Sequence, residues 1–326
     1  MASSTSPPEV QTFTVPPTSL TTITNKNILI TGGSSGIGLA TGELLVSLSP
    51  TNTLTILDIS PPPPTSPLLS SSASRVHYHK CDLTSWPQQR AGFAAAISHF
   101  GPLDVVFVNA GIPEGKDEFF NEDVEEGTGL LKEPDRKVLE VDLNAAVDTV
   151  KLALYWLRKN RKNGKGGKGG GGGGSIVMTA SLAGYIASAG AGMYSAAKHG
   201  IVGLMRALKN DTATLNIAIS VVAPAVTVTP ILAQQNARAR DEAPAVWAAE
   251  LAKFGVPINK VESIALAVGY LVNLGIRANG MGLLVQADRV VDFEAGLARS
   301  RGVWMGREML GLFRAGREAP IFENKL

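Results

Sequence analysis

A short apolar run that leads directly into a cluster of glycines constrains this chain more than any other feature. Asn27-Ile28-Leu29-Ile30-Thr31 is rich in β-branched residues and ends in glycine, as strands buried on both faces do. The turn Gly32-Gly33-Ser34-Ser35-Gly36-Ile37-Gly38 follows, and a helical pattern then continues to about Leu48. Because glycine lets the backbone turn sharply and approach a ligand closely, this order predicts the start of a βαβ unit.

The alternation of short apolar runs and helical patterns continues along the chain. Further strands are predicted at 53–57, 75–79, 103–108, 175–179, 217–222 and 282–286, and helices at 85–100, 135–159, 192–209 and 261–274. Strands that alternate with helices indicate a parallel sheet covered on both faces. We therefore expect an α/β, single-domain Rossmann fold with a doubly wound parallel sheet of seven strands.

The expected domain spans residues 26–298, and the remaining segments differ from it in composition. Residues 1–25 are rich in Ser, Thr and Pro, which predicts a disordered tail, and residues 299–326 form a C-terminal extension that keeps aromatic residues. Within the domain we expect low-complexity loops at 60–74 and 163–174 and an acidic insertion at 113–134. The glycine-rich loop lacks the Gly-Lys-Ser/Thr ending of a phosphate-binding loop, which favours a flexible linker.

Composition excludes several classes of function. Thirty basic residues balance 28 acidic ones, so we expect neither nucleic acid nor an anionic membrane as a partner. No run reaches the roughly 18 apolar residues of a membrane span. The single cysteine, Cys81, cannot form an intramolecular disulfide, which favours a reducing compartment and a cytoplasmic protein. No metal site is expected, because the four histidines are scattered: His77, His79, His99 and His199.

A carboxylate after the second strand indicates which dinucleotide the glycine turn would bind. Asp58 follows Gly38 by 20 residues, the spacing expected of a ligand to the ribose 2′-hydroxyl. A carboxylate at this place accepts from ribose hydroxyls and repels a 2′-phosphate, so we expect NAD(H) and not NADP(H). The alternative is that Asp58 is an ordinary turn residue at the end of a strand.

Tyr194 and Lys198 are the candidates for proton transfer. Residues four apart share one face of a helix, so the phenol and the ammonium can reach one site. A free tyrosine has a pKa of about 10, and a nearby lysine cation favours its phenolate. Tyr194 would then take the proton of an alcohol as its hydride leaves. Ser181, thirteen residues before Tyr194, follows an apolar strand. A chance pairing on an amphipathic helix, and a helix-capping serine, are the alternatives.

Together these motifs resemble the short-chain dehydrogenase/reductase family over roughly residues 26–290. The resemblance rests on the glycine spacing, on Cys81-Asp82-Leu83, on Asn109-Ala110-Gly111 and on Tyr194-Ser195-Ala196-Ala197-Lys198. It implies that Ser181 hydrogen-bonds the substrate oxygen, that Lys198 holds the nicotinamide ribose and that Thr229 contacts the cofactor. The residues that we expect to bind NAD(H) are Gly32, Ser34, Ser35, Gly36, Ile37, Gly38, Asp58, Asp82, Leu83, Asn109, Ala110, Gly111, Tyr194, Lys198 and Thr229.

Two positions depart from the family pattern. Asp142, in Val141-Asp142-Leu143-Asn144-Ala145, stands where many members carry an asparagine that helps to hold a proton-relay water. A carboxylate accepts from that water but cannot donate when ionised, and it can pair with Lys198. We expect Asp142 to act in catalysis with an altered pH optimum. Ala225 replaces the usual glycine after Pro224, which predicts a shifted loop before Thr229.

The narrower resemblance is to NAD-linked hydroxyprostaglandin-dehydrogenase-like enzymes and to fungal natural-product alcohol dehydrogenases. Residues 198–203 and the acidic insertion carry it. We expect an NAD-dependent oxidoreductase that interconverts a secondary alcohol and a ketone on a hydrophobic small molecule, in secondary metabolism. The resemblance also implies a homodimer or homotetramer. A cofactor-binding protein with little redox turnover, such as a sensor or a repurposed scaffold, remains the alternative.

Overall fold

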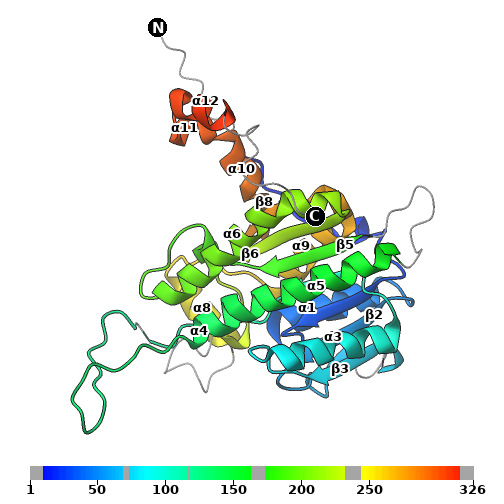
Figure 1. The fold of residues 1–326 in the computed structure, drawn as a ribbon, viewed down its shortest axis with the longest axis horizontal. Coiled ribbons are helices and arrows are strands. Elements are labelled where there is room, and N and C mark those ends of the chain that lie inside the picture. The colour runs from blue at the N-terminus through cyan, green and yellow to red at the C-terminus, as the bar shows by residue number, and fades with distance from the viewer. Residues whose placement is uncertain (1–9, 69–72, 117, 163–172, 232–243, 316–326) are drawn as a thin grey trace.

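The computed structural model is built around one eight-stranded sheet between two layers of helices (Figure 1). It describes residues 10–68, 73–116, 118–162, 173–231 and 244–315. The strand order is β3-β2-β1-β4-β5-β6-β7-β8. The strands are β1 (Asn27–Thr31), β2 (Thr53–Asp58), β3 (Val76–Lys80), β4 (Val105–Val108), β5 (Gly174–Thr179), β6 (Ile217–Pro224), β7 (Gly282–Gln286) and β8 (Arg289–Asp292).

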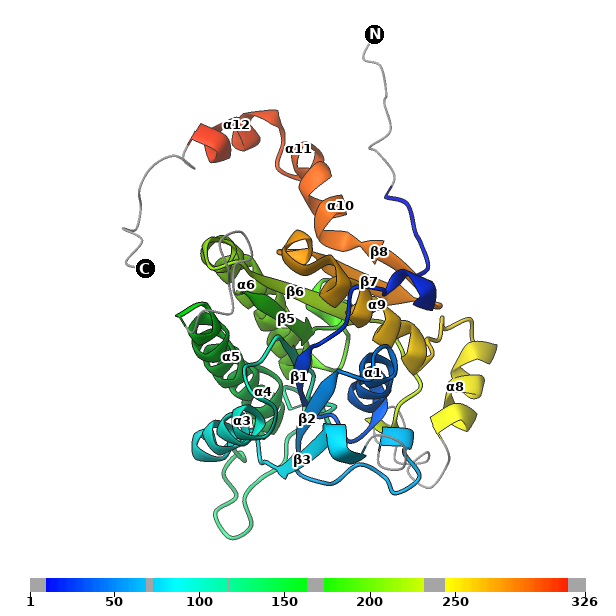
Figure 2. The ribbon, with the colours of Figure 1, turned by 90° about the vertical axis from the view of Figure 1, so that its right-hand side faces the viewer.

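The helices that cover the sheet divide the core into two layers. The helices are α1 (Gly36–Ser47), α3 (Trp86–Phe100), α4 (Lys137–Leu139), α5 (Ala145–Lys162), α6 (Gly192–Thr214), α8 (Pro244–Lys253), α9 (Val261–Leu274), α10 (Phe293–Arg299), α11 (Arg301–Trp304) and α12 (Arg307–Ala315). Helices α3, α5 and α6 pack on one face, and α1 and α9 pack on the other (Figure 2). Both faces of the central strands are therefore buried, which explains why these strands read as continuous apolar runs.

All seven predicted strands are present, and they are parallel to one another. The eighth strand, β8, was not predicted and pairs antiparallel with β7. It has only four residues and follows a tight turn in which Ala287 and Asp288 have φ angles of 49° and 60°. A turn of two residues joins antiparallel neighbours without a crossover helix, so the alternation of strands and helices does not reveal it.

The prediction of a disordered N-terminal tail is wrong for residues 10–25. Phe13 exchanges two backbone hydrogen bonds of 2.8 Å with Val290 of β8. Val15, Leu20 and Ile23 are buried in the layer that contains α1 and α9. These three buried side chains and the pairing of Phe13 with the edge strand β8 anchor this segment. Residues 1–9 lie outside the described part of the chain, as do residues 163–172 of the glycine-rich loop.

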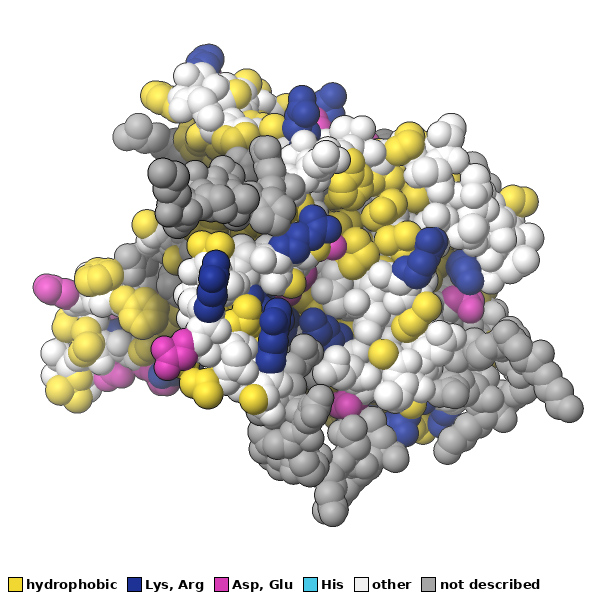
Figure 3. Space-filling model, turned by 90° about the horizontal axis from the view of Figure 1, so that it is seen from above, with side chains coloured by type: hydrophobic (Ala, Val, Ile, Leu, Met, Phe, Trp, Pro, Cys, Tyr) yellow, Lys and Arg dark blue, Asp and Glu magenta, His cyan; other side chains and the backbone are white. Residues whose placement is uncertain are grey.

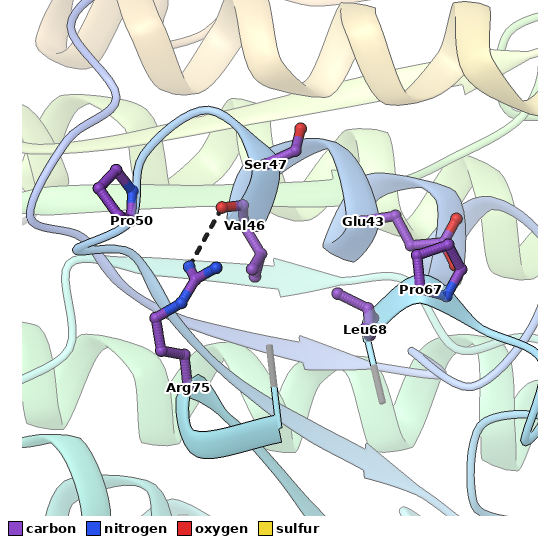
Figure 4. A pocket seen from close by; sticks show the side chains of 7 residues that line it. All are labelled: Glu43, Val46, Ser47, Pro50, Pro67, Leu68 and Arg75. Atoms are coloured by element: carbon purple, nitrogen blue, oxygen red, sulfur yellow. Dashed lines mark hydrogen bonds between the residues drawn. The ribbon is translucent and has the colours of Figure 1, made fainter. Parts of the chain in front are cut away.

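The predicted loop at 60–74 is anchored as far as it is described. Leu68 is buried against α1, and Arg75 donates hydrogen bonds to the carbonyl oxygens of Val46, Ser49 and Asn52. Figure 4 shows both residues beside a hollow of about 320 Å³ at the end of α1. A cation at the C-terminus of a helix satisfies carbonyl groups that lack intrahelical partners.

One helical stretch, Val261–Ala278, is long and apolar enough to cross a membrane by length and composition. Its side chains Ile264, Val268 and Leu271 are completely buried in the layer that also contains α1. This packing identifies the stretch as a core helix of the domain.

Candidate active site

A cleft of about 1110 Å³ lies at the carboxyl ends of the parallel strands. The strand order reverses between β1 and β4, and ligands bind at such a reversal in open α/β sheets. The predicted residues that line it are Gly32, Ser35, Gly36, Ile37, Asp58, Asp82, Leu83, Asn109, Ala110, Gly111, Asp142, Ser181, Tyr194, Lys198 and Thr229. The predicted Ser34 and Gly38 belong to the same turn but do not line the cleft.

The glycine turn has a shape that larger residues do not permit. Gly32 and Gly36 have φ angles of 66° and 51°, in the left-handed region that favours glycine. A Cβ added to Gly38 would lie 2.1 Å from the carbonyl oxygen of Gly32. The first helix has no side-chain cap at Ser35, and its first residues, Gly36 and Ile37, line the cleft, so N–H groups that lack intrahelical partners are available there. These features fit a pyrophosphate group.

Asp58 lies beside this turn at the end of β2. Its carboxylate accepts hydrogen bonds from the backbone N–H of Ser34 (3.1 Å) and of Ser60 (3.2 Å). The turn and the second strand are thereby joined, and the carboxylate faces the cleft at the place expected for a ribose ligand.

Asn109, at the end of β4, is hydrogen-bonded to the ends of β1 and β5. Its backbone N–H donates to Thr31 Oγ1 and its Nδ2 donates to the carbonyl oxygen of Gly32, each at 3.0 Å. Its Oδ1 accepts a hydrogen bond from Thr179 Oγ1 at 3.0 Å.

Cys81 is completely buried, and burial raises the pKa of its thiol to about 11. The thiol therefore remains protonated at neutral pH and acts as a core residue.

Ser181, Tyr194 and Lys198 line the same cleft. Ser181 caps a short 3₁₀ helix, η4 (Leu182–Gly184), by accepting a hydrogen bond from the N–H of Ala183. The Lys198 ammonium lies 5.4 Å from the centre of the Tyr194 ring and donates to the carbonyl oxygen of Thr179 at 3.2 Å. The structure thus brings together the three residues that the motifs predict.

Asp142 joins the same group through a buried ion pair. Its Oδ2 lies 3.0 Å from Lys198 Nζ, and its Oδ1 accepts a hydrogen bond of 2.8 Å from the N–H of Ile112. Burial lowers the pKa of Lys198, but the Asp142 carboxylate and Tyr194 outweigh it, so the pKa of Lys198 is raised. Asp142 belongs to a π-helix, η3 (Glu140–Asn144), and π-turns are frequent at functional sites. Asn144 is exposed and takes no part.

Glu114 is a residue of this site that the sequence did not identify. Its Oε2 accepts a hydrogen bond of 2.8 Å from the N–H of Tyr194, while Ala191, before the helix, supplies no side-chain cap. Its Oε1 is buried without a hydrogen-bond partner among the described residues. Phe119 lies against the same helical turn, since a Cβ added to Gly192 would be 2.7 Å from its ring. These contacts span about 80 residues, so no local pattern reveals them.

The predicted disturbance at Ala225 is absent. Its φ angle is not in the left-handed region, and its N–H donates to the carbonyl oxygen of Val285 at 2.9 Å. The backbone here does not require glycine. The methyl group of Thr229, four residues later, lies beside Gly36, because a Cβ added to Gly36 would be 3.3 Å from Thr229 Cγ2.

The histidines are less scattered than the sequence indicates. His77 stacks on His99 with ring centres 3.7 Å apart, and His79 lies 6.2 Å from His77. Strand β3 and helix α3 bring them together across 22 residues. Stacked rings do not converge on one point, and the described residues contain no group of three or more ligands that could hold a metal ion.

Comparisons with known proteins identify relatives of this chain. A family model described as short chain dehydrogenase matches residues 26–240. A short-chain dehydrogenase/reductase of Stachybotrys chlorohalonatus is 30% identical over 97% of this chain and 95% of its own. A 5'-hydroxyaverantin dehydrogenase of Emericella nidulans is 30% identical over 92% of this chain and 96% of its own. Levodione reductase, a solved structure, aligns with a TM-score of 0.63 and 26% identity over 81% of this chain and 97% of that chain. The chain therefore belongs to the short-chain dehydrogenase/reductase family, whose members bind a nicotinamide cofactor and act on CH–OH groups.

Proposed function

We propose that this protein is an NAD-dependent dehydrogenase that oxidises a secondary alcohol of a hydrophobic natural product to the ketone. The observation that carries the proposal is one cleft lined by Asp58 and the glycine turn and also by Ser181, Tyr194 and Lys198. A bound nicotinamide supplies the hydride acceptor for oxidation and the hydride donor for reduction. The glycine turn and the free N–H groups of α1 would hold its pyrophosphate, and Asp58 its ribose.

The protein's own residues move the proton. Ser181 Oγ orients the substrate oxygen by hydrogen bonding, and Tyr194 Oη takes the proton from the alcohol. The Lys198 ammonium, 5.4 Å from the Tyr194 ring, stabilises the negative charge on the phenol oxygen. Asp142 acts in this site by holding Lys198 in place, because the ion pair joins two almost completely buried side chains.

The walls of the cleft favour an apolar substrate. Apolar side chains line the cleft, among them Ile112, Val141, Leu182, Ile186, Val226 and Ile231. The name of the Emericella nidulans relative states that it is a dehydrogenase of 5'-hydroxyaverantin. We accordingly place the substrate among hydroxylated natural products. Because the single cysteine, Cys81, favours a reducing compartment, we also propose that the protein is cytoplasmic.

Binding and turnover measured together test the proposal. NADH and NADPH are titrated by fluorescence, and hydrophobic secondary alcohols are then screened with NAD⁺ for formation of reduced nicotinamide. We expect tighter binding of NADH, and a loss of turnover by about 100-fold or more in Tyr194→Phe. Tight binding without turnover on any hydrophobic alcohol or ketone, or turnover that Tyr194→Phe leaves unchanged, would overturn the dehydrogenase.

The role of Asp58 has its own test. Asp58→Ala should reduce the preference for NADH over NADPH by about 10- to 100-fold, because hydrogen bonds to a charged group contribute about 1.5–3 kcal/mol. Asp82→Asn, which changes another carboxylate of the same cleft, is the matched control and should leave this ratio unchanged. An equal effect of both substitutions would contradict a specific role for Asp58.

A further inference from the structure

Residues 299–315, which include α11 and α12, form an arm that projects from the domain (Figures 1 and 2). Neither helix has a buried residue, and Trp304 and Leu312 are 60% and 62% exposed. In α12, Met309 and Leu312 are exposed on the same face as Phe313, whose ring Arg301 contacts at 5.7 Å, while Arg307 and Arg314 lie on the opposite face. A helix of nine residues is marginal by itself in water, so this apolar face indicates a packing partner.

The acidic insertion carries a second uncovered apolar surface. Residues 123–132 form a hairpin through the bonds Glu125 N–Leu130 O and Lys132 N–Asp123 O, both 2.9 Å. Its cross-strand pair, Val124 and Leu131, is exposed, and Leu131 is 72% exposed. An isolated two-stranded hairpin is marginally stable at best, so this element also indicates a partner.

The two surfaces have opposite charge. Between Arg299 and Ala315 the arm carries four arginines and one glutamate. Between Glu118 and Glu133 the insertion carries six carboxylates and one lysine. In Figure 3 the left-hand lobe, on the side where Figure 1 shows the insertion, combines hydrophobic and acidic side chains. Apolar faces with complementary charged margins are typical of surfaces that bind each other.

The arm and the insertion of one chain are far apart. In both ribbon views they project from opposite ends of the molecule (Figures 1 and 2). We propose that the arm, residues 299–315, of one copy docks on residues 118–133 of the insertion of a second copy. In a pair related by a two-fold axis, each copy contributes one arm and one insertion, so both uncovered surfaces are buried.

Docking has a consequence for catalysis, which rests on the proposed function. The insertion is bound to the first turn of α6 by the Glu114–Tyr194 hydrogen bond and by the packing of Phe119 on Gly192. A second copy that holds the insertion in place therefore also holds the first turn of α6, which carries Tyr194. Turnover per chain should rise as the protein concentration rises.

Cross-linking between two single-cysteine variants tests the docking without any substrate. The natural Cys81 is completely buried, so introduced cysteines report alone. Leu312→Cys places a thiol on the arm, Leu131→Cys places one on the insertion, and Ile276→Cys, 43% exposed and outside both surfaces, is the control. With a bis-maleimide, we expect a cross-linked dimer from the mixture of Leu312→Cys and Leu131→Cys. Neither variant alone, nor Ile276→Cys mixed with either, should give it.

Charge reversal supplies the second measurement. The double variant Arg307→Glu, Arg314→Glu, made in Leu312→Cys, should abolish the cross-link. Its partner Glu122→Lys, Glu126→Lys, made in Leu131→Cys, should do the same with an unreversed arm, and mixing the two reversed variants should restore it. Failure of the first mixture to cross-link, or a yield that charge reversal leaves unchanged, overturns the docking. If the mixture of Leu312→Cys and Leu131→Cys does not cross-link and the protein instead sediments with phosphatidylserine vesicles through the arm, the partner is a membrane surface and the docking is overturned.

Discussion

Lys198 Nζ lies 3.0 Å from Asp142 Oδ2, and the two side chains are only 4% and 1% exposed. The π-helix η3 turns the carboxylate inward, and the N–H of Ile112 holds its other oxygen. The ammonium beside the Tyr194 ring is thus held by a buried carboxylate. Removing one member of a buried pair costs much more than the pair itself contributes, because the remaining charge is left without a partner.

Replacement of Asp142 should therefore change both stability and pH dependence. Asp142→Ala is expected to lower the free energy of unfolding by about 3–5 kcal/mol, and Asp142→Asn by less. Because the pKa of Lys198 is raised in the folded protein, this stabilisation is present at neutral pH and is lost only as the pH rises through that pKa. In Asp142→Asn, the carboxylate no longer raises the pKa of Lys198 and only Tyr194 opposes the effect of burial, so the alkaline limb of the kcat profile should move to lower pH. An unchanged profile would contradict a role for Asp142 in proton transfer.

Gly38→Ala should abolish binding of the dinucleotide. The added Cβ would lie 2.1 Å from the carbonyl oxygen of Gly32, so the turn must open. Gly203→Ala is the matched control, because Gly203 lies in α6 with nothing within 4 Å of an added Cβ. This control should bind NADH normally and gain up to about 1 kcal/mol in stability. NADH titration and urea unfolding of both variants measure the difference, and normal NADH affinity in Gly38→Ala would refute the geometry of the turn.

Glu114 is expected to position Tyr194 through its backbone. Glu114→Gln keeps an oxygen that can accept from the N–H of Tyr194, whereas Glu114→Ala removes it. Glu114→Ala should lower kcat by about 10-fold, with KM and NADH affinity nearly unchanged, since loss of a hydrogen bond to a charged group costs at least about 1.5 kcal/mol. Glu114→Gln should recover most of kcat. Equal kcat in the alanine variant and the natural protein would show that the contact is only structural.

The stacked histidines should make stability depend on pH. Burial, then His99 and His79, lower the pKa of His77 from its ordinary value of 6.5. The unfolded chain therefore binds more protons at His77 than the folded chain does. The contribution of His77 to the free energy of unfolding is complete above pH 6.5 and is lost as the pH drops through 6.5 towards the lower folded pKa. Urea unfolding at several pH values measures this slope, which His99→Gln should reduce. His199→Gln is the control, because His199 makes the same type of bond to the carbonyl four residues earlier but lies outside the stack. Equal slopes in both variants would contradict this origin.

The sequence by itself determined the features that depend on local pattern. The apolar runs Ile28–Ile30 and Val105–Val108 form buried central strands because a sheet covered on both faces needs continuous apolar side chains. The spacing of Tyr194 and Lys198 places both at one site because they share one face of a single helix. Motifs that follow successive parallel strands meet because the carboxyl ends of those strands lie on one edge of the sheet.

Only the tertiary structure decided the contacts between segments that have no pattern of their own. The Asp142–Lys198 pair spans 56 residues and needs a π-turn, and the Glu114–Tyr194 bond starts in an irregular loop. The backbone pairing of Phe13 with β8 and the stacking of His77 on His99 likewise depend on how separate elements pack together. A hydrogen bond or an ion pair depends on distances of about 3 Å, which periodicity along one segment does not encode.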